Sequence, residues 1–297
     1  MTQPGEQISS ADVLARAAAL ARVDARGAVR IREGSHVIFE LPNGVVARIG
    51  ESGSYQVAQR ELCISRWLNQ NGIETVRAAD DISQPTVVGD RPVTWWTLIP
   101  DHRPSTPGEL GSMLRKLHTL TPPTEFPLPS YAPFDGLRER LESAAAIDEA
   151  DRSWLLTQYV QLRQRYDDID DPLPPCVIHG DAWQGNLVVP PSGHPIVLDL
   201  DNVSMGWREW DLVQLAVDYT DFQRISDNEY RGFVAAYGGY DVTRWASYRV
   251  LADIQELRWV AFAASRSDAS SAAASEASHR IACVRGLVPR PWTWQAL

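Results

Sequence analysis

The sequence predicts an α+β protein with two lobes: a small lobe with an antiparallel sheet and one main helix, and a larger, mostly helical lobe. Short β-prone runs are concentrated in the first 100 residues, and helical periodicity dominates after the proline-bearing stretch 100–107. Charge divides at the same place, because residues 1–100 hold ten basic and eleven acidic residues, whereas 101–297 hold eighteen and twenty-seven. We therefore expect an N-terminal lobe over residues 1–100 and a C-terminal lobe over 101–297.

The elements of the first lobe follow from period and turn chemistry. Asn43-Gly44 supplies the positive φ of a tight hairpin turn between two β-prone runs. Gly72 ends the main helix, as glycine commonly does after a last helical turn. Helices are expected over about residues 9–22 and 54–71, and strands over 36–41, 44–49, 86–88 and 93–99.

The second lobe is read in the same way. Gly238-Gly239 breaks its last helical region, and the Ser/Ala tract 265–275 is expected to be an exposed loop or a frayed helix end. Helices are expected over 108–120, 135–146 and 150–166 and from about 210 onward, and short strands over 176–178, 187–189 and 196–200. The strands frame a polar loop over residues 179–186.

Composition excludes several classes of protein. The net charge of −10 repels nucleic acid and anionic membranes, and no run of residues is long and apolar enough to span a membrane. Three separated cysteines and an N-terminus unlike a secretion signal predict a soluble cytoplasmic protein with free thiols. Of the 28 basic residues, 27 are arginine and only Lys116 is lysine.

Three polar side chains stand at the ends of short apolar runs in the second lobe. Asp181, Asn186 and Asp199 supply two carboxylates and an amide oxygen. Phosphoryl transfer needs such a set, because one carboxylate orients the incoming hydroxyl and takes its proton while hard oxygen ligands hold Mg²⁺. The tripeptide at residues 179–181 alone would suit a simple turn, but Asn186 and Asp199 favour a site.

These residues resemble the aminoglycoside phosphotransferase family, whose members are related to protein kinases. His179-Gly180-Asp181 followed by Asn186 is similar to the family's His-Gly-Asp-x4-Asn catalytic loop, and Asp199 matches its metal-binding segment. The resemblance covers about residues 30–285 and implies a protein-kinase-like fold. It implies that Asp181 is the catalytic base, that His179 supports the loop, and that Asn186 and Asp199 bind Mg²⁺.

Two further acids follow the same segment. Asp201, two residues beyond Asp199, is a third candidate for the metal or for a substrate ammonium group, although a solvated strand-end acid is an equal alternative. Asp211 matches the family's aspartate that steadies the catalytic loop from the start of the next helix.

The resemblance also assigns groups that bind the phosphates of the nucleotide. Arg48 stands on the third strand, where most relatives have lysine, and Glu61 stands where the family has an ion-pair glutamate. Arginine contacts phosphate through a planar fork rather than a point charge, so this difference bears on nucleotide binding. Lys116 lies too far along the fold to replace it, and the alternative is that Arg48 and Glu61 are surface charges.

Two other segments are expected to border the nucleotide. Gly34 and Ser35 fall in a loop that would cover the phosphates, although it is nearly free of glycine. Trp96, Thr97 and Leu98 fall in the hinge between lobes, whose backbone groups would pair with a purine edge. The expected cofactors are Mg²⁺ and ATP or GTP as phosphate donor.

The acceptor is expected to bind the second lobe. Trp183 lies within the catalytic loop, and Asp218, Asp221 and Glu256 are candidates for binding ammonium groups. The acidity of this lobe suits a small, hydroxylated and cationic acceptor such as an aminoglycoside, but an ordinary acidic surface explains the same charge. Macrolides, choline and other hydroxylated metabolites are further acceptors within the family.

Two other functions compete with a small-molecule kinase. A catalytically weak or inactive kinase-fold binding module is suggested by the missing lysine and the glycine-poor loop. A metal-dependent phosphohydrolase is disfavoured, because two-metal sites are usually richer in histidine than this chain with its six scattered residues. The oligomeric state is not readable from the sequence.

Overall fold

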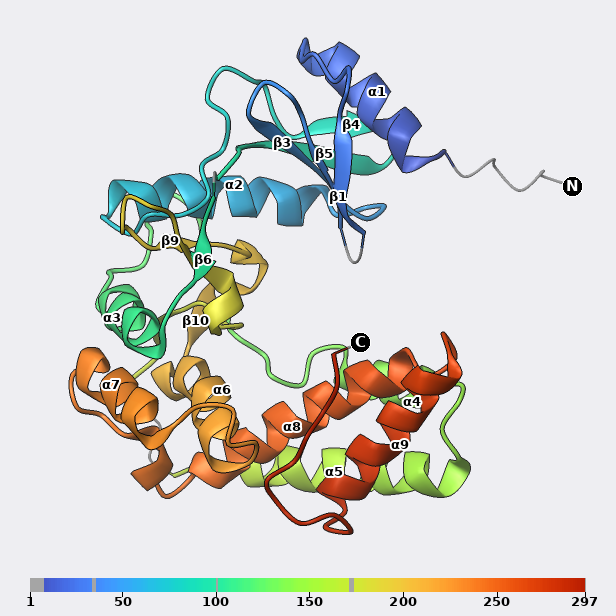
Figure 1. Cartoon of the computed structure of the whole chain (residues 1–297), viewed down its shortest axis with the longest axis vertical. Coiled ribbons are helices and arrows are strands. Elements are labelled where there is room, and N and C mark those ends of the chain that lie inside the picture. Colours follow the sequence, from blue (N-terminus) through green and yellow to red (C-terminus); the bar gives the residue numbers. More distant parts are fainter. Residues whose placement is uncertain (1–7, 34–35, 100, 171–173, 297) are drawn as a thin grey trace, which may run out of the picture. The chain divides into compact units, whose positions relative to one another are not determined.

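The structure is a computed structural model that describes residues 8–33, 36–99, 101–170 and 174–296. Its contacts form two compact units. The sheet unit contains the described part of 1–104 together with 123–126 and 185–201, and the helical unit contains 105–122, 127–184 and the described residues from 202 onward. The α+β class predicted from the sequence is confirmed (Figure 1). Among the described residues, no helix has the length and apolar character that crossing a membrane requires.

The sheet unit is built on a five-stranded antiparallel sheet. Its strands, in spatial order, are β1 (Val29–Glu33), β2 (Val37–Glu40), β3 (Val45–Ile49), β5 (Arg91–Thr97) and β4 (Thr86–Val88). The predicted hairpin is confirmed, because Gly44 has φ +75° and the backbone of Leu41 bonds that of Val45 across the turn. β1 was not predicted as a strand, although valine and isoleucine alternate with arginine along it, a pattern typical of strands.

Two helices lie on opposite faces of this sheet (Figure 1). α1 (Ser10–Ala21) packs on the face that carries Phe39, Ala47 and Trp95, which stand side by side on β2, β3 and β5. α2 (Tyr55–Gln70) packs against Trp96 on the other face. Because side chains alternate along a strand, Arg48 points to the α2 face of β3.

A second, three-stranded sheet belongs to the same unit. It joins β6 (Arg103–Pro104), β8 (Leu187–Val189) and β9 (Ile196–Val197) in antiparallel pairs. β9 was predicted to extend to Leu200, but Asp199 has φ +54°, so the chain leaves the extended conformation there. Leu200–Asn202 then form a short 3-10 turn.

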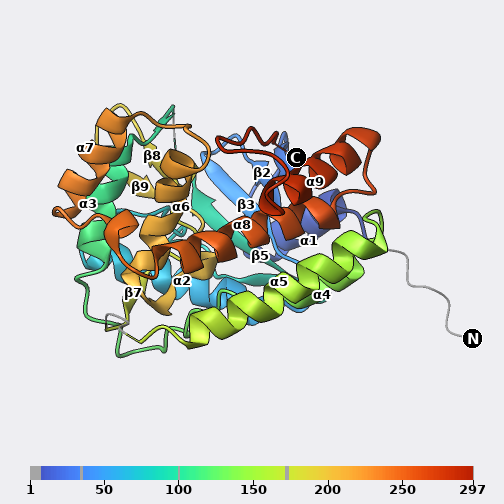
Figure 2. The ribbon, with the colours of Figure 1, turned by 90° about the horizontal axis from the view of Figure 1, so that it is seen from below.

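The helical unit is organised around α8 (Tyr248–Ser265). It packs against four helices: α4 (Leu137–Ser143), α5 (Glu149–Asp167), α6 (Arg208–Thr220) and α9 (Ser271–Val284). Figure 2 shows α5 running alongside α8. α3 (Pro107–Leu117) packs against α7 (Asp227–Tyr237) in the same unit. β7 (Cys176–Ile178) pairs with β10 (Ser204–Gly206).

One expectation for this unit was wrong in part. The tract 265–275 was predicted to be a loop or a frayed end, but α9 begins at Ser271 inside it. The side chain of Ser270 accepts the backbone N–H of Ala273 and caps the helix, and the alanines that follow are strong helix formers. Only the first half of the tract lies between helices.

Candidate functional site

A single buried carboxylate of the helical unit holds the backbone of the predicted catalytic loop. Asp211, in the first turn of α6, is inaccessible to solvent. Its Oδ2 accepts the N–H of His179 at 2.7 Å, and its Oδ1 accepts the N–H of Gly180 at 2.8 Å. Bonds from backbone amides to a carboxylate are short and strong, so the two together fix the course of the loop. The contact expected of Asp211 is confirmed.

Three residues behind this carboxylate were missed by sequence reasoning. Nε2 of His118, at the end of α3, lies 3.0 Å from Asp211 Oδ2, and its Nδ1 lies 2.7 Å from the hydroxyl of Tyr237. The indole N–H of Trp210 donates to the Gly180 carbonyl at 3.1 Å. His118 is 93 positions from Asp211 and 119 from Tyr237, so no local spacing links them. The only signal in the sequence was that His118, a polar residue, stands at the end of the apolar face of α3.

Gly180 is the residue at which the loop turns. It has φ +80°, a region that side chains with Cβ rarely adopt. A Cβ atom placed there would lie 2.5 Å from the carbonyl oxygen of Asn202 and 3.0 Å from the ring of Tyr131. Glycine is therefore required both by the backbone angle and by the close approach of two neighbouring segments.

The side chains around Gly180 differ in exposure. His179 is buried, and its Nδ1 accepts the backbone N–H of Asp181 at 3.3 Å, so this imidazole supports the loop from within. Asp181 is half-buried. Trp183 is 45% exposed, unlike most large aromatic side chains of the described chain. The assignments of Asp181 and Trp183 to catalysis and acceptor binding stay predictions.

The predicted metal ligands come together in the sheet unit. The backbone N–H of Leu198 donates to the Asn186 carbonyl at 2.9 Å, next to the antiparallel pair β8–β9, which sets Asn186 beside Asp199. The backbone of Asp199 lies in the left-handed region at φ +54°, which aspartate enters more readily than most residues with a Cβ. The 3-10 turn that follows carries Asp201.

Arg48 lies among these carboxylates. Its side chain is 14% exposed, and its Nη1 donates to Oε1 of Glu61, which projects from α2. Its Nη2 donates to Oδ2 of Asp201 at 2.7 Å and lies 3.7 Å from Oδ1 of Asp199. Both nitrogens of the His36 ring lie within 3.3 Å of the same Nη2. The two residues predicted to anchor phosphate and two of the predicted metal ligands, Asp199 and Asp201, therefore form one cluster.

Burial decides the charges in this cluster. Burial and the hydrogen bond with Asp201 raise the pKa of Glu61, against the effect of Arg48. Burial acts in the same direction on Asp201, but the bond to Glu61 and the charge of Arg48 lower the pKa of that carboxyl below its ordinary value. Asp201 is thus the ionised partner of the pair. Burial and the positive charge of Arg48 lower the pKa of His36, which is neutral at pH 7.

The donor set of this cluster fits a hard divalent cation. Oδ1 of Asp201 is buried and makes no hydrogen bond within the described chain, so this oxygen has a lone pair left to bind a cation. The carboxylate of Asp199 lies in the same cluster, and the amide oxygen of Asn186 stays a predicted ligand. No three His, Cys, Asp or Glu side chains converge on a point among the residues described. Mg²⁺ in a phosphotransferase does not require this, because it takes one or two carboxylates together with phosphates and waters.

The residues expected beside the nucleotide base are in the sheet unit as well. Trp96 is buried, and the backbone N–H groups of Thr97 and Leu98 donate to the carbonyls of Arg77 and Gly44 at 2.8 and 2.9 Å. These two amides are therefore engaged and do not offer donors to a purine. Gly34 and Ser35 lie outside the described residues.

The carboxylates predicted to bind an acceptor ammonium already hold guanidinium groups. Asp218 pairs with Arg224, and Asp221 and Glu256 both pair with Arg249 and Arg290. Asp221 and Glu256 are each 3% exposed, and Arg249 reaches them at 2.7 and 2.6 Å. An acceptor ammonium would have to displace arginine at each of these positions.

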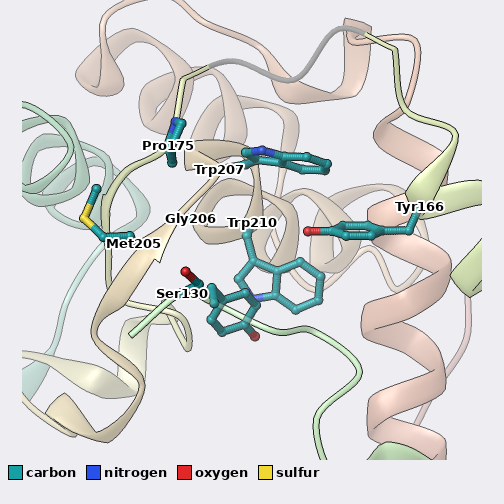
Figure 3. Close-up of a pocket in the computed structure, with 8 residues that line it drawn as sticks. Ser130, Tyr166, Pro175, Met205, Gly206, Trp207 and Trp210 are labelled. Carbon is teal, nitrogen blue, oxygen red and sulfur yellow. The ribbon is translucent and has the colours of Figure 1, made fainter. Parts of the chain in front are cut away.

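A cavity of about 230 Å³ within the helical unit is lined largely by aromatic rings (Figure 3). Trp207 stacks on Tyr166 with ring centroids 4.8 Å apart, and Tyr131 is tilted against Trp210 at 5.1 Å. The hydroxyl of Tyr131 is buried and has no hydrogen-bond partner in the described part of the chain. Trp210 also bonds the catalytic loop at Gly180, so the cavity wall and the loop share a side chain.

The antiparallel sheet with its main helix, the helical unit and the clamped loop define a protein of the kinase-like class. A sequence profile described as the phosphotransferase enzyme family, APH, matches residues 32–251, more than half of the chain. The chain belongs to this family. The recognition made from the His-Gly-Asp segment and the expected enzyme class are both confirmed.

Individual relatives are more distant. A probable ketoamine kinase of Enterococcus faecium is 32% identical over 80 residues, which cover 25% of this chain and 28% of that protein. The match thus spans less than a third of the relative. An amicoumacin kinase solved with AMP-PNP, Ca²⁺ and Ami has a TM-score of 0.71 at 14% identity, with 95% of each chain covered. A choline/ethanolamine kinase family protein from Mesorhizobium loti has a TM-score of 0.64 at 17% identity, with 93% and 94% covered. These structural likenesses establish the fold.

Proposed function

We propose that the protein transfers the γ-phosphate of ATP or GTP to a hydroxyl group of a small molecule, with Asp181 as the base. The observation that carries the proposal is the loop clamp, in which Asp211 holds the amides of His179 and Gly180 at 2.7 and 2.8 Å. Phosphoryl transfer depends on positioning and charge stabilisation more than on covalent chemistry. A rigid turn directly before a half-buried carboxylate suits the orientation of an acceptor hydroxyl and the removal of its proton.

The two units divide the remaining tasks in this proposal. The sheet unit binds the nucleotide, with Arg48 on its phosphates and Asn186, Asp199 and Asp201 holding Mg²⁺. When bound, the ion neutralises charge on the phosphate oxygens. The unpartnered buried oxygen of Asp201 supports this assignment. The helical unit carries Asp181 and the acceptor. A nucleoside triphosphate donor agrees with the cytoplasmic location expected from the sequence.

The proposed acceptor is a hydroxylated molecule that also bears an amine. The relatives support this class by their names, since ketoamines, choline and ethanolamine combine a hydroxyl with an amino or ammonium group. Aminoglycoside-like antibiotics belong to the same chemical class. Trp183 is the acceptor contact in this proposal, because it is exposed on the loop that carries Asp181.

The test is nucleotide consumption by the purified protein with Mg²⁺ and a panel of ketoamines, amino alcohols, aminoglycosides and macrolides. Asp181→Ala should lower turnover by about 10²–10⁴-fold, the usual effect of removing a general base, and leave nucleotide binding by calorimetry nearly unchanged. Asp268→Asn, an exposed aspartate between α8 and α9, is the control and should match the wild type. Unchanged turnover in Asp181→Ala contradicts the role of this residue. Nucleotide binding without turnover of any acceptor favours the binding module instead.

A further inference from the structure

Arg48 contacts both the glutamate predicted to orient it toward phosphate and an aspartate predicted to bind the metal. Its Nη1 donates to Glu61, and its Nη2 donates to Asp201 at 2.7 Å. The same Nη2 lies 3.7 Å from Asp199. One guanidinium therefore occupies the neighbourhood of two carboxylates that we assign to Mg²⁺.

The geometry of this contact depends on arginine. The guanidinium is a planar fork, so one nitrogen bonds α2 through Glu61 while the other bonds the 3-10 turn through Asp201. A lysine ammonium carries its three donors on one rotatable nitrogen at the end of a flexible stem, so it does not hold two carboxylates at a fixed separation. The side chain of Arg48 is only 14% exposed and that of Glu61 only 5%, so water screens the pair weakly.

The carboxylates are left partly satisfied by this arrangement. Oδ2 of Asp201 accepts a hydrogen bond from Nη2 of Arg48, whereas its Oδ1 is buried and without a hydrogen-bond partner in the residues described. The side chain of Asp199 is 38% exposed. Because Arg48 Nη2 is a positive group in contact with Asp201, it opposes the approach of a second cation to the same carboxylates.

We propose that Arg48 is the resident counter-cation of Asp199 and Asp201, and that a divalent cation binds these carboxylates in competition with Nη2 of Arg48. This inference rests on the proposed function, which assigns the two carboxylates to the metal. Glu61 keeps its bond to Nη1, so the guanidinium stays tethered when Nη2 leaves Asp201. A phosphate that takes Nη2 relieves the competition. By linkage, phosphate and divalent cation each raise the affinity for the other.

The test measures Mn²⁺ binding to the full-length, nucleotide-free protein by electron paramagnetic resonance, with Mn²⁺ as a stand-in that shares the oxygen preference of Mg²⁺. Arg48→Gln removes the competing charge and should tighten Mn²⁺ binding by about 10-fold, within the usual range of coupling between sites. Arg48→Lys keeps a charge in the cluster and should tighten it by a smaller factor. Arg66→Gln removes the same charge from the exposed face of α2 and should change binding less than about twofold.

Circular dichroism establishes that each variant is folded, and Arg48→Lys decides the matter if Arg48→Gln is not. Mn²⁺ binding that is equal to or weaker than wild type in the folded Arg48 variants overturns the inference. Asp199→Asn and Asp201→Asn separate it from the proposed function. If these two weaken Mn²⁺ binding but the Arg48 variants do not tighten it, only the counter-cation role fails. If Mn²⁺ binding is absent, or indifferent to Asp199 and Asp201, the metal assignment itself fails.

A second readout is the coupling between the ion and ADP. In wild type, ADP should tighten Mn²⁺ binding in part by drawing Arg48 from Asp201. This part is missing in Arg48→Gln, so the ratio of Mn²⁺ affinities with and without ADP should be smaller in the variant by about the same 10-fold factor. An unchanged ratio in folded Arg48→Gln contradicts the inference.

Discussion

Replacing Asp211 with asparagine tests how the catalytic loop is held in place. Three buried donors meet its two oxygens: the amides of His179 and Gly180 and Nε2 of His118, at 2.7, 2.8 and 3.0 Å. Asparagine has the same shape but one accepting oxygen, and its NH2 group then faces a donor. At least one charge-assisted bond worth about 1.5–3 kcal/mol is lost, and the remaining bonds fall to roughly half their strength. We expect the free energy of unfolding to drop by about 3 kcal/mol.

Urea unfolding followed by circular dichroism measures this loss, and hydrogen exchange of peptides containing His179 and Gly180 localises it. Asp218→Asn is the matched control on the same helix. Its partner Arg224 is 42% exposed, and a pair of this kind contributes at most about 1 kcal/mol. If Asp211→Asn unfolds within about 0.5 kcal/mol of wild type and the loop amides stay equally protected, the clamp is not what orders the loop.

Three further outcomes follow from the helical unit and the turn after β8. Gly180→Ala should lower the free energy of unfolding in urea by about 2 kcal/mol or more, because φ is +80° and the new Cβ would lie 2.5 Å from the Asn202 carbonyl oxygen. Gly193 has the same φ but nothing described within 4 Å of a Cβ, so Gly193→Ala should lower it by only about 1 kcal/mol. Burial and the hydrogen bond with Asp221 raise the pKa of Glu256 from 4.5 to about 9 in the folded protein. The folded state therefore holds this proton more tightly than the unfolded state, and the free energy of unfolding of the wild type falls as the pH rises from about 4.5 to about 9. Glu256→Gln lacks this titration, so its free energy of unfolding should rise relative to that of the wild type between about pH 5 and 9. The same pH dependence in both proteins would contradict the raised pKa. Tyr131→Phe removes a buried hydroxyl that lacks a partner in the described chain, so its unfolding free energy should stay equal or rise by up to about 1 kcal/mol, and a clear loss would reveal a partner.

The fold was predictable where short-range chemistry decides it. The turn at Asn43-Gly44 was predictable because glycine adopts positive φ readily, and Gly44 has φ +75°, whereas Asn43 does not adopt positive φ. The alternation of valine and isoleucine with arginine along β1 was a strand signal that the prediction overlooked. Val29 and Ile31 are both exposed at this edge of the sheet, so β1 is held by its pairing with β2 rather than by burial of apolar side chains. The start of α9 depends on capping by Ser270, which a reading of the Ser/Ala tract as flexible overlooked.

The polar residues of the candidate site could be predicted from the sequence, but the hydrogen bonds and ion pairs that hold them could not. Asp181, Asn186 and Asp199 were indicated by their places at the ends of apolar runs, and their roles by the resemblance to the family's catalytic loop. The contact of His118 with Asp211 joins helices that are 93 positions apart, and no periodicity reports such a pair. The arginine partners of Asp221 were equally hidden, since a count of acidic residues does not show which are already neutralised.

The guanidinium at position 48 also affects how this protein can be labelled. Nucleotide analogues that carry an amine-reactive group modify a lysine beside the bound phosphates, and Arg48 presents no such amine. The single lysine of the chain, Lys116, is on α3 in the other unit. In the proposed function Arg48 binds the phosphates, so a reagent that acylates a lysine on β3 has no target at that position. Reagents directed at guanidinium groups, such as dicarbonyl compounds, would be the appropriate probes.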